Sequence, residues 1–244
     1  MPPERRMTVA EERAARSAAR RDRPQPEPPL LRFDRRERAL HWVNATLFGT
    51  LMLTGAALYA GPISAIVGNR EVVRTIHVYS GLLLPVPLLL AVLGRRGARL
   101  RTDLGRLNRW SRDDRRWFRR RHRATVRLGK FNPGQKLNAA FLGSAVVVML
   151  GTGIVLKWFS LFSLHTRTGA TFVHDWVALG IWFAVAGHIL LALRDPDALA
   201  GMRRGRVPAR WARVHRPRWY EAETGEAASR LAPPASAASS RPSS

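Results

Sequence analysis

Cysteine is absent from this chain of 244 residues. The absence excludes disulfide bonds, thiolate metal sites and iron–sulfur clusters held by this chain. Acidic residues are also scarce, with 17 against 41 lysines and arginines, and the formal net charge is +24. An excess of positive charge raises the question of nucleic-acid binding, but the placement of the basic residues favours a different explanation.

Charge is also missing from long stretches of the chain. Residues 41–60, 75–93 and 137–156 contain no charged side chain, and residues 173–193 contain only Asp175. About 20 apolar residues in a helix cover the roughly 30 Å hydrocarbon core of a bilayer. Because lipid offers the backbone no hydrogen bonds, we expect each stretch to be a membrane-spanning helix. Pro85 and Pro87 predict a kink in the second one.

The basic residues lie almost entirely outside these stretches. Residues 1–40, 94–136 and 194–244 together carry 37 of the 41 lysines and arginines. Since positive charge stays in the cytoplasm, both termini and the long middle loop are predicted to be cytoplasmic. Membrane topology and attraction to anionic lipid then account for the charge, and we expect no nucleic-acid partner.

Composition also divides the chain. Residues 1–32 are predicted to be a disordered basic arm without the apolar core of a signal peptide. The membrane domain is expected at 33–204. Residues 205–244 are predicted to be a basic and then disordered cytoplasmic tail.

Three of the seven histidines lie outside the apolar stretches. His122 and His215 lie in arginine-rich segments, and His165 lies in the expected outer connection. We expect all three at the surface.

The other four histidines, His41, His77, His174 and His188, lie in or at the end of an apolar stretch. A histidine at membrane depth is costly and usually functional. The predicted orientation places His41 and His188 near the inner face, and His77 and His174 near the outer face. Each depth therefore holds two histidines from different helices.

The spacing on the fourth stretch indicates what the histidines bind. His174 and His188 are 14 residues apart, so they point from nearly the same helix face and are separated by about 21 Å along the axis. This distance is too large for one metal ion and suits one ligand to each of two cofactors. Haem with two axial histidines needs imidazoles that face each other from opposed helices. The predicted axial pairs are His41 with His188 and His77 with His174.

Zinc is the competing metal, and the sequence does not support it. Two histidines alone do not make a zinc site, and neither cysteines nor a carboxylate cluster supply the missing ligands. Asp175 follows His174 directly, but neighbouring residues on a helix point about 100° apart. The expected fold class is therefore all-α, an integral membrane four-helix bundle that binds two b-type haems.

Two further segments make the pattern resemble a known family. The run RALHW at 38–42 opens the first apolar stretch, and GKFNPGQK at 129–136 precedes the third. With the four histidines, they resemble the cytochrome b (gamma) subunit of membrane-bound respiratory formate dehydrogenases over roughly residues 33–204. The wider group includes cytochrome b subunits of nickel–iron hydrogenases, which stay the alternative; segment 129–136 favours the formate dehydrogenase branch.

The resemblance implies a place in an oxidoreductase complex of anaerobic respiration in the bacterial inner membrane. Its partners would be an iron–sulfur (beta) subunit and a molybdenum or tungsten catalytic (alpha) subunit that oxidises formate, so this chain has no catalytic residue of its own. Electrons would pass from the periplasmic side through two haem b groups to menaquinone or ubiquinone near the cytoplasmic face. The implied quinone contacts are Asn132, Gly134 and His188, with Gln135 as a further candidate.

Other interpretations stay open at this point. Asn132 and Pro133-Gly134 also suit a plain turn at a helix start, because Asn caps helices and Pro-Gly is common in turns. Intramembrane histidines also occur in transporters, but the apolar stretches lack the carboxylates of a proton relay and show no inverted repeat. A haem-free membrane anchor would have no use for four histidines at matched depths.

Overall fold

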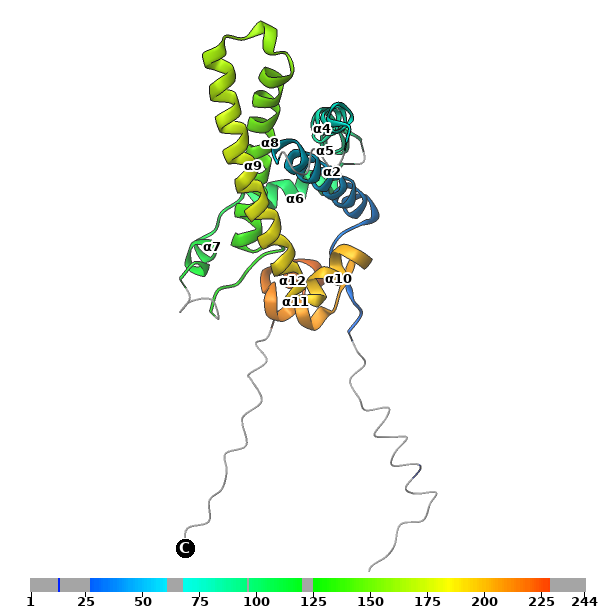
Figure 1. The fold of residues 1–244 in the computed structure, drawn as a ribbon. Coiled ribbons are helices and arrows are strands. Elements are labelled where there is room, and N and C mark those ends of the chain that lie inside the picture. Colours follow the sequence, from blue (N-terminus) through cyan, green and yellow to red (C-terminus); the bar gives the residue numbers. More distant parts are fainter. Residues whose placement is uncertain (1–12, 14–26, 61–67, 96, 120–124, 229–244) are drawn as a thin grey trace, which may run out of the picture.

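The structure is a computed structural model, and it describes residue 13 and residues 27–60, 68–95, 97–119 and 125–228. Helices dominate these residues (Figure 1). In chain order the elements are β1 (Leu30–Leu31), α2 (Arg35–Tyr59), α4 (Arg70–Leu83), α5 (Val86–Leu93), α6 (Ala98–Asn108), α7 (Arg112–Trp117), α8 (Pro133–Lys157), the 3-10 helix η2 (Phe159–Leu161), α9 (Leu164–Leu193), α10 (Pro196–Arg204), β2 (Arg206–Val207), α11 (Ala209–His215) and α12 (Pro217–Thr224).

Helix α2 carries the first predicted span and begins before it, at Arg35. Asp34 caps this end, because its carboxylate accepts hydrogen bonds from the backbone N–H groups of Arg36 and Glu37. The Glu37 carboxylate accepts in turn from the N–H of Asp34. This capping box satisfies donors that the first turn of a helix leaves free. It also places Glu37 one turn before His41.

The second predicted span is interrupted where its prolines lie. Helix α4 ends at Leu83 and α5 begins at Val86, with Pro85 as the N-cap of α5. Proline has no N–H to donate and its ring clashes with the preceding turn, so the helix is broken there. The helix is therefore interrupted at the place where the kink is predicted, although Leu84 and Pro85 keep right-handed helical dihedrals.

Helices α8 and α9 form an antiparallel pair joined by η2 (Figure 1). Asn132 caps α8 with a second capping box, in which Gln135 is the partner. The Ser163 side chain caps α9 by accepting from the N–H of Thr166. The two helices cover the third and fourth predicted spans and extend beyond both.

Three segments of the described chain are long and apolar enough to cross a membrane: Arg70–Leu93, Pro133–Lys157 and Leu164–Leu193. They correspond to the second, third and fourth predicted spans. Helix α2 does not reach the same hydropathy, since Asn44 and the threonines at 46, 50 and 54 interrupt its apolar residues. The first span therefore stays a prediction.

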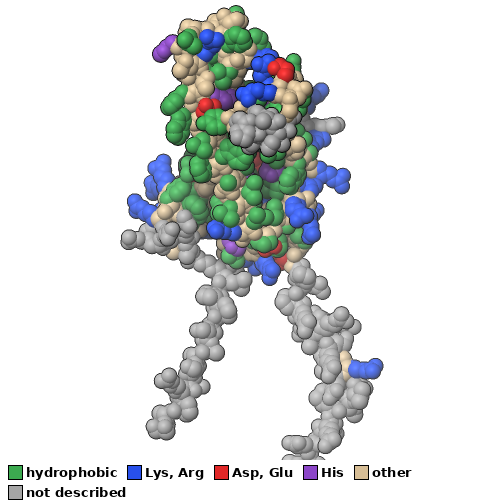
Figure 2. Space-filling view, in the orientation of Figure 1, with side chains coloured by type: hydrophobic (Ala, Val, Ile, Leu, Met, Phe, Trp, Pro, Cys, Tyr) green, Lys and Arg blue, Asp and Glu red, His purple; other side chains and the backbone are tan. Residues whose placement is uncertain are grey.

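Large apolar side chains on the long helices face outward. Leu53 and Val147 are 70% exposed, and Phe183 is 72% exposed. Figure 2 shows hydrophobic side chains covering the middle of the visible face. A water-soluble chain rarely exposes apolar surface of this extent, whereas lipid accepts it.

The four long helices pack as two antiparallel pairs. Helix α2 packs against α4, α8 packs against α9, and α4 also contacts α8. These are contacts that a four-helix bundle requires.

A small domain that we name the cap closes the end where α2 begins and α9 ends. It consists of β1, β2 and helices α10, α11 and α12. Strands β1 and β2 pair antiparallel, with Leu30 opposite Val207 and Leu31 opposite Arg206. A buried apolar cluster forms its core: Val207, Ala209, Trp211, Ala212, Trp219 and Tyr220.

The cap places the predicted domain boundaries differently. Leu30 and Leu31 form a strand, although the sequence predicts that they belong to the disordered basic arm. Arg32, also within the predicted arm, is only 1% exposed, and its guanidinium carbon lies 4.7 Å from the centroid of the Trp211 ring. The basic tail from residue 205 is folded into β2, α11 and α12 as far as Thr224. The density of arginines did not predict a folded cap, because a charged segment is expected to face water. Here guanidinium groups stack on aromatic rings instead.

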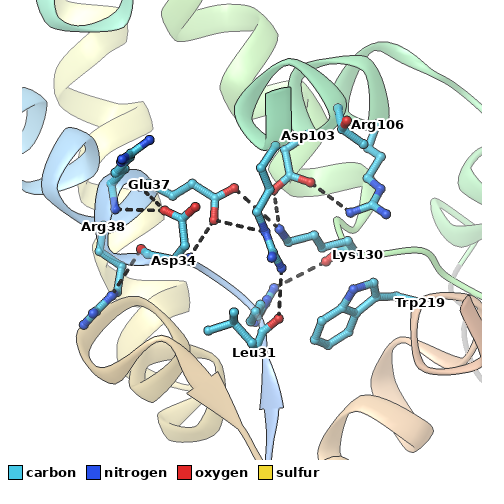
Figure 3. A network of polar contacts seen from close by, with 12 residues as sticks. Leu31, Asp34, Glu37, Arg38, Asp103, Arg106, Lys130 and Trp219 are labelled. Carbon is cyan, nitrogen blue, oxygen red and sulfur yellow. Dashed lines mark hydrogen bonds and ion pairs between the residues drawn. The ribbon is translucent and has the colours of Figure 1, made fainter. Parts of the chain in front are cut away.

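Between the cap and the long helices lies a layer of buried ion pairs (Figure 3). Lys130, 3% exposed, forms an ion pair with Asp103, and its Nζ lies 3.9 Å from the Glu37 carboxylate. Asp103 also accepts from Arg106 at 3.0 Å. Burial lowers the pKa of Lys130, although the two carboxylates favour its charged form. Helices α2 and α6 and the segment before α8 are thus held together by charge pairs.

We expect the loss of one partner of the Lys130–Asp103 pair to destabilise the fold strongly. Asp103→Asn leaves the buried Lys130 ammonium with only the more distant Glu37 carboxylate, and loss of one partner of a buried pair costs about 3–5 kcal/mol. The double variant Asp103→Leu, Lys130→Met should lose less than either single charge removal. The measurement is the free energy of unfolding in detergent.

The exposed pair Glu71–Arg74 is a matched control, with side chains 68% and 57% exposed. Because solvent screens exposed pairs, Glu71→Gln should cost less than about 1 kcal/mol. Equal losses in Glu71→Gln and Asp103→Asn would contradict the prediction.

Candidate haem sites

The structure brings the first predicted histidine pair together. His41 lies on α2 and His188 on α9, and their ring centroids are 6.2 Å apart with an angle of 56° between the ring planes. Both lie near the cap, since His41 is close to the start of α2 and His188 is close to the end of α9. We name this the cap-side pair.

The second predicted pair is also brought together. His77 lies on α4 and His174 on α9, with centroids 6.3 Å apart and an interplanar angle of 62°. We name this the far pair. Both pairs therefore use α9, and each joins it to a different helix.

The separations fit one haem iron between each pair of rings. A bond from a metal ion to an imidazole nitrogen is about 2 Å long, and that nitrogen lies about 1 Å from its ring centre, so two axial imidazoles have centroids roughly 6 Å apart. The observed 6.2 Å and 6.3 Å agree with this sum. Simple packing of two histidine rings would not explain why both pairs have nearly the same separation.

The ligand sets exclude most other metals. In the part of the chain that the structure describes, no group of three or more His, Cys, Asp or Glu side chains could hold an ion. Each pair thus offers two imidazole nitrogens and no third protein ligand. A cofactor that brings its own equatorial ligands, as a porphyrin does, suits such a site.

Threonine side chains support both histidines of the far pair. The Oγ1 of Thr54 on α2 lies 2.9 Å from the Nδ1 of His77. The Oγ1 of Thr152 on α8 lies 2.9 Å from the Nδ1 of His174. In each helix pair, the first helix therefore supports the histidine of the second.

The two other described histidines, His165 and His215, lie apart from these sites. His165 is exposed in the first turn of α9. His215 is exposed at the end of α11 and stacks on Trp211, with ring centroids 5.4 Å apart. His122 lies outside the described residues.

The predicted quinone residues Asn132, Gly134 and Gln135 form the turn that starts α8. Asn132 Oδ1 accepts from the N–H of Gln135 at 2.8 Å, and Gln135 Oε1 accepts from the N–H of Asn132 at 2.9 Å. A Cβ on Gly134 would lie 3.6 Å from the ring of Trp117. Both amides thus serve the helix start, as the simpler interpretation expects, and each keeps its NH₂ group for other contacts.

A second buried ion pair anchors this turn. Lys136 donates to the Asp114 carboxylate at 2.8 Å and to the Arg109 carbonyl at 2.6 Å. Burial alone would raise the pKa of Asp114, but hydrogen bonds from Lys136 and Ser111 outweigh it and hold that pKa below its usual value.

Comparison with known proteins places these features in a family. A model of the family described as prokaryotic cytochrome b561 matches residues 32–205, a range that contains all four paired histidines. The chain belongs to the prokaryotic cytochrome b561 family. Membership implies a b-type haem cofactor and a membrane location, and it confirms the resemblance inferred from the sequence.

Relatives of this cytochrome b561 chain carry more specific names. The formate dehydrogenase cytochrome b556 subunit of Haemophilus influenzae is 28% identical over 202 residues, which are 80% of this chain and 83% of the relative. The nitrate-inducible formate dehydrogenase cytochrome b556(Fdn) subunit of Escherichia coli K12 is 32% identical over 104 residues, 41% of this chain and 48% of the relative.

Sequence reasoning placed the four histidines but missed Thr54 and Thr152. Each is followed by glycine, at Gly55 and Gly153, and each precedes its histidine by a similar interval, 23 residues in one case and 22 in the other. This repeated Thr-Gly spacing was the available signal. A Thr-Gly pair followed by a histidine 22 or 23 residues after the threonine occurs only twice in this cytochrome b561 chain, so it does not appear as a repeat of fixed period.

The Asp114–Lys136 pair predicts a pH dependence of stability. A carboxyl whose folded pKa is lowered stabilises the fold above its unfolded pKa, about 3.9, and loses that contribution as the pH falls through the folded pKa. The loss of stability in Asp114→Asn should therefore be full near neutral pH and shrink below about pH 4. Unfolding in detergent, measured from pH 7 to pH 3, checks this. A difference that stays constant over that range would contradict it.

Proposed function

We propose that this chain is the dihaem cytochrome b subunit of a formate dehydrogenase complex, and that it carries electrons to a membrane quinone. The observation that carries the proposal is the pair of imidazole couples, whose centroids are 6.2 Å and 6.3 Å apart. Both couples use α9, so one helix would hold two cofactors at different depths.

The four histidines would be the haem ligands. His41 and His188 would hold the haem nearer the cap, and His77 and His174 would hold the far one. Bound haem supplies the one-electron chemistry. The protein residues set the distance between the two sites, the surrounding polarity and the donor strength of each imidazole.

The complex is proposed from the relatives. Formate dehydrogenase cytochrome b556 subunits are similar to this chain over as much as 80% of its length. The proposed partners are an iron–sulfur subunit and a molybdenum or tungsten subunit on which formate is oxidised. The chain is then a subunit of an oxidoreductase, and no residue of its own reacts with formate.

The orientation is proposed from the charge. Arginine and lysine side chains concentrate in the cap, in α6 and α7 and in the segments beside them. Positive charge stays in the cytoplasm, so the cap, both termini and the cap-side pair would face the cytoplasm in the bacterial inner membrane. The far pair would then lie near the periplasm and receive electrons first.

The quinone site is proposed at the start of α8, beside the cap-side pair. Helices α8 and α9 are antiparallel, so the α8 start lies at the same end of the pair as His188. Asn132, Gly134, Gln135 and His188 would contact menaquinone or ubiquinone. Reduction there takes protons from the cytoplasm, while the electrons come from the other side.

Two haems per chain are expected in the purified protein, visible in a reduced-minus-oxidised absorbance spectrum. His174→Ala and His188→Ala should each lose one haem, and the remaining redox component should differ between the two variants. Pyridine haemochrome quantitation and a redox titration measure this.

His165→Ala is the control, because His165 lies on the same helix and is exposed. It should keep both haems. A wild-type protein purified from haem-replete cells without haem absorbance would contradict the proposal and favour a membrane anchor or a transporter. Loss of the same component in both variants would show that the pairing is wrong.

The quinone site has a separate test. Asn132→Ser keeps a capping oxygen at the start of α8 but removes the amide NH₂. One neutral hydrogen bond contributes about 1 kcal/mol, so the affinity for a quinone analogue should fall roughly fivefold. Both haem spectra should stay unchanged. Wild-type affinity in Asn132→Ser would show that Asn132 only caps the helix.

A further inference from the structure

The two histidine pairs differ in their hydrogen bonds. Both imidazoles of the far pair lie 2.9 Å from a threonine hydroxyl. Among the described residues, neither His41 nor His188 of the cap-side pair forms a side-chain hydrogen bond. The difference gives the two sites different chemistry even though their ring separations match.

The proton of each threonine hydroxyl is already used. Thr54 Oγ1 lies 2.6 Å from the backbone carbonyl of Thr50, and Thr152 Oγ1 lies 2.9 Å from that of Val148. A hydroxyl has one proton, and a carbonyl oxygen only accepts. Each hydroxyl therefore donates to its own helix and accepts a hydrogen bond from the histidine.

This assignment fixes the protonation of both rings. The Nδ1 atoms of His77 and His174 carry the proton, so Nε2 is left with a free lone pair. The nitrogen that does not donate is the one that ligates a metal.

A glycine lies beside each ring edge. A Cβ on Gly55 would lie 3.3 Å from Cε1 of His77, which is a tight contact, and a Cβ on Gly153 would lie 3.9 Å from Cε1 of His174, which is an ordinary contact. Each Thr-Gly pair thus places a hydroxyl at Nδ1 and a glycine beside the neighbouring carbon. The same arrangement occurs on α2 and on α8, which argues against a chance contact.

We propose that Thr54 and Thr152 are positioning residues that hold His77 and His174 with Nε2 toward the iron and lower the reduction potential of the far haem. The inference rests on the proposed function, in that both pairs hold haem. A hydrogen bond donated from Nδ1–H makes the imidazole a stronger donor, which stabilises ferric over ferrous iron. Among the described residues the cap-side pair has no such bond, so a haem held there would have the higher potential and would accept electrons from the far one.

The test is a redox titration of the purified full-length chain with both haems, followed by absorbance. Thr54→Val keeps the branched side chain and removes the hydroxyl. We expect an upward shift of the lower-potential component and an unchanged higher-potential component. Thr152→Val should do the same, and the double variant should shift further. Thr54→Ser keeps the hydroxyl and should have the wild-type potential.

Thr46→Val is the matched control. Thr46 is on the same helix and donates to the Trp42 carbonyl at 3.0 Å, the same backbone bond that Thr54 makes, but it makes no hydrogen bond to a histidine among the described residues. It should leave both potentials unchanged. An equal shift in Thr46→Val would overturn the inference.

The remaining outcomes also decide. Unchanged potentials in the Thr54→Val, Thr152→Val double variant would overturn the inference, and so would a shift of the higher-potential component. If Thr54→Val loses the far haem altogether, Thr54→Ser decides: recovery of haem and potential supports the positioning role, and no recovery refutes it.

Failure of the proposed function has a different signature. A wild-type chain without two haem components would remove the basis of both ideas. A wild-type chain with two components and insensitive threonine variants would refute the inference alone.

Discussion

One spacing on one helix controls both candidate haem sites. His174 and His188 are 14 residues apart on α9, an interval that returns nearly to the same helix face. Helices α2 and α4 each need to present only one imidazole toward that face. An insertion of a single residue between the two α9 histidines would rotate one of them by about 100° and separate it from its mate. The rest of the fold holds α2, α4 and α9 so that their four histidines meet in two pairs.

The long helices and the cap are stabilised by different forces. In lipid there is little hydrophobic force between helices, so packing and side-chain hydrogen bonds must hold them. The threonine–histidine contacts join α2 to α4 and α8 to α9 in this way. The cap instead has an apolar core, the kind of interior that water stabilises, and buried ion pairs lie between the cap and the long helices. Bound haem would add a further link between helices at each pair.

The sequence was sufficient where a strong physical constraint repeats. Absence of charge located the apolar helices, the prolines located the break after α4, and the α9 spacing paired the histidines. The cap was missed because its segments lie far apart in sequence and are rich in arginine. From the sequence, Arg32 is expected to be a solvated charge, and only the structure shows that Trp211 lies against it. The threonine contacts were missed because helical threonines commonly bond only to their own backbone.

The β1–β2 pairing joins residues 30–31 to residues 206–207, on either side of all four long helices. Residue 207 is synthesised after α9, so the strand pair cannot form until the ribosome has passed every apolar helix. Closure of the cap is therefore a late step in biogenesis, and it ties the start of α2 to the end of α9. In a truncated chain that lacks β2, the start of α2 would not be tied to the end of α9, even if all the long helices had inserted into the membrane.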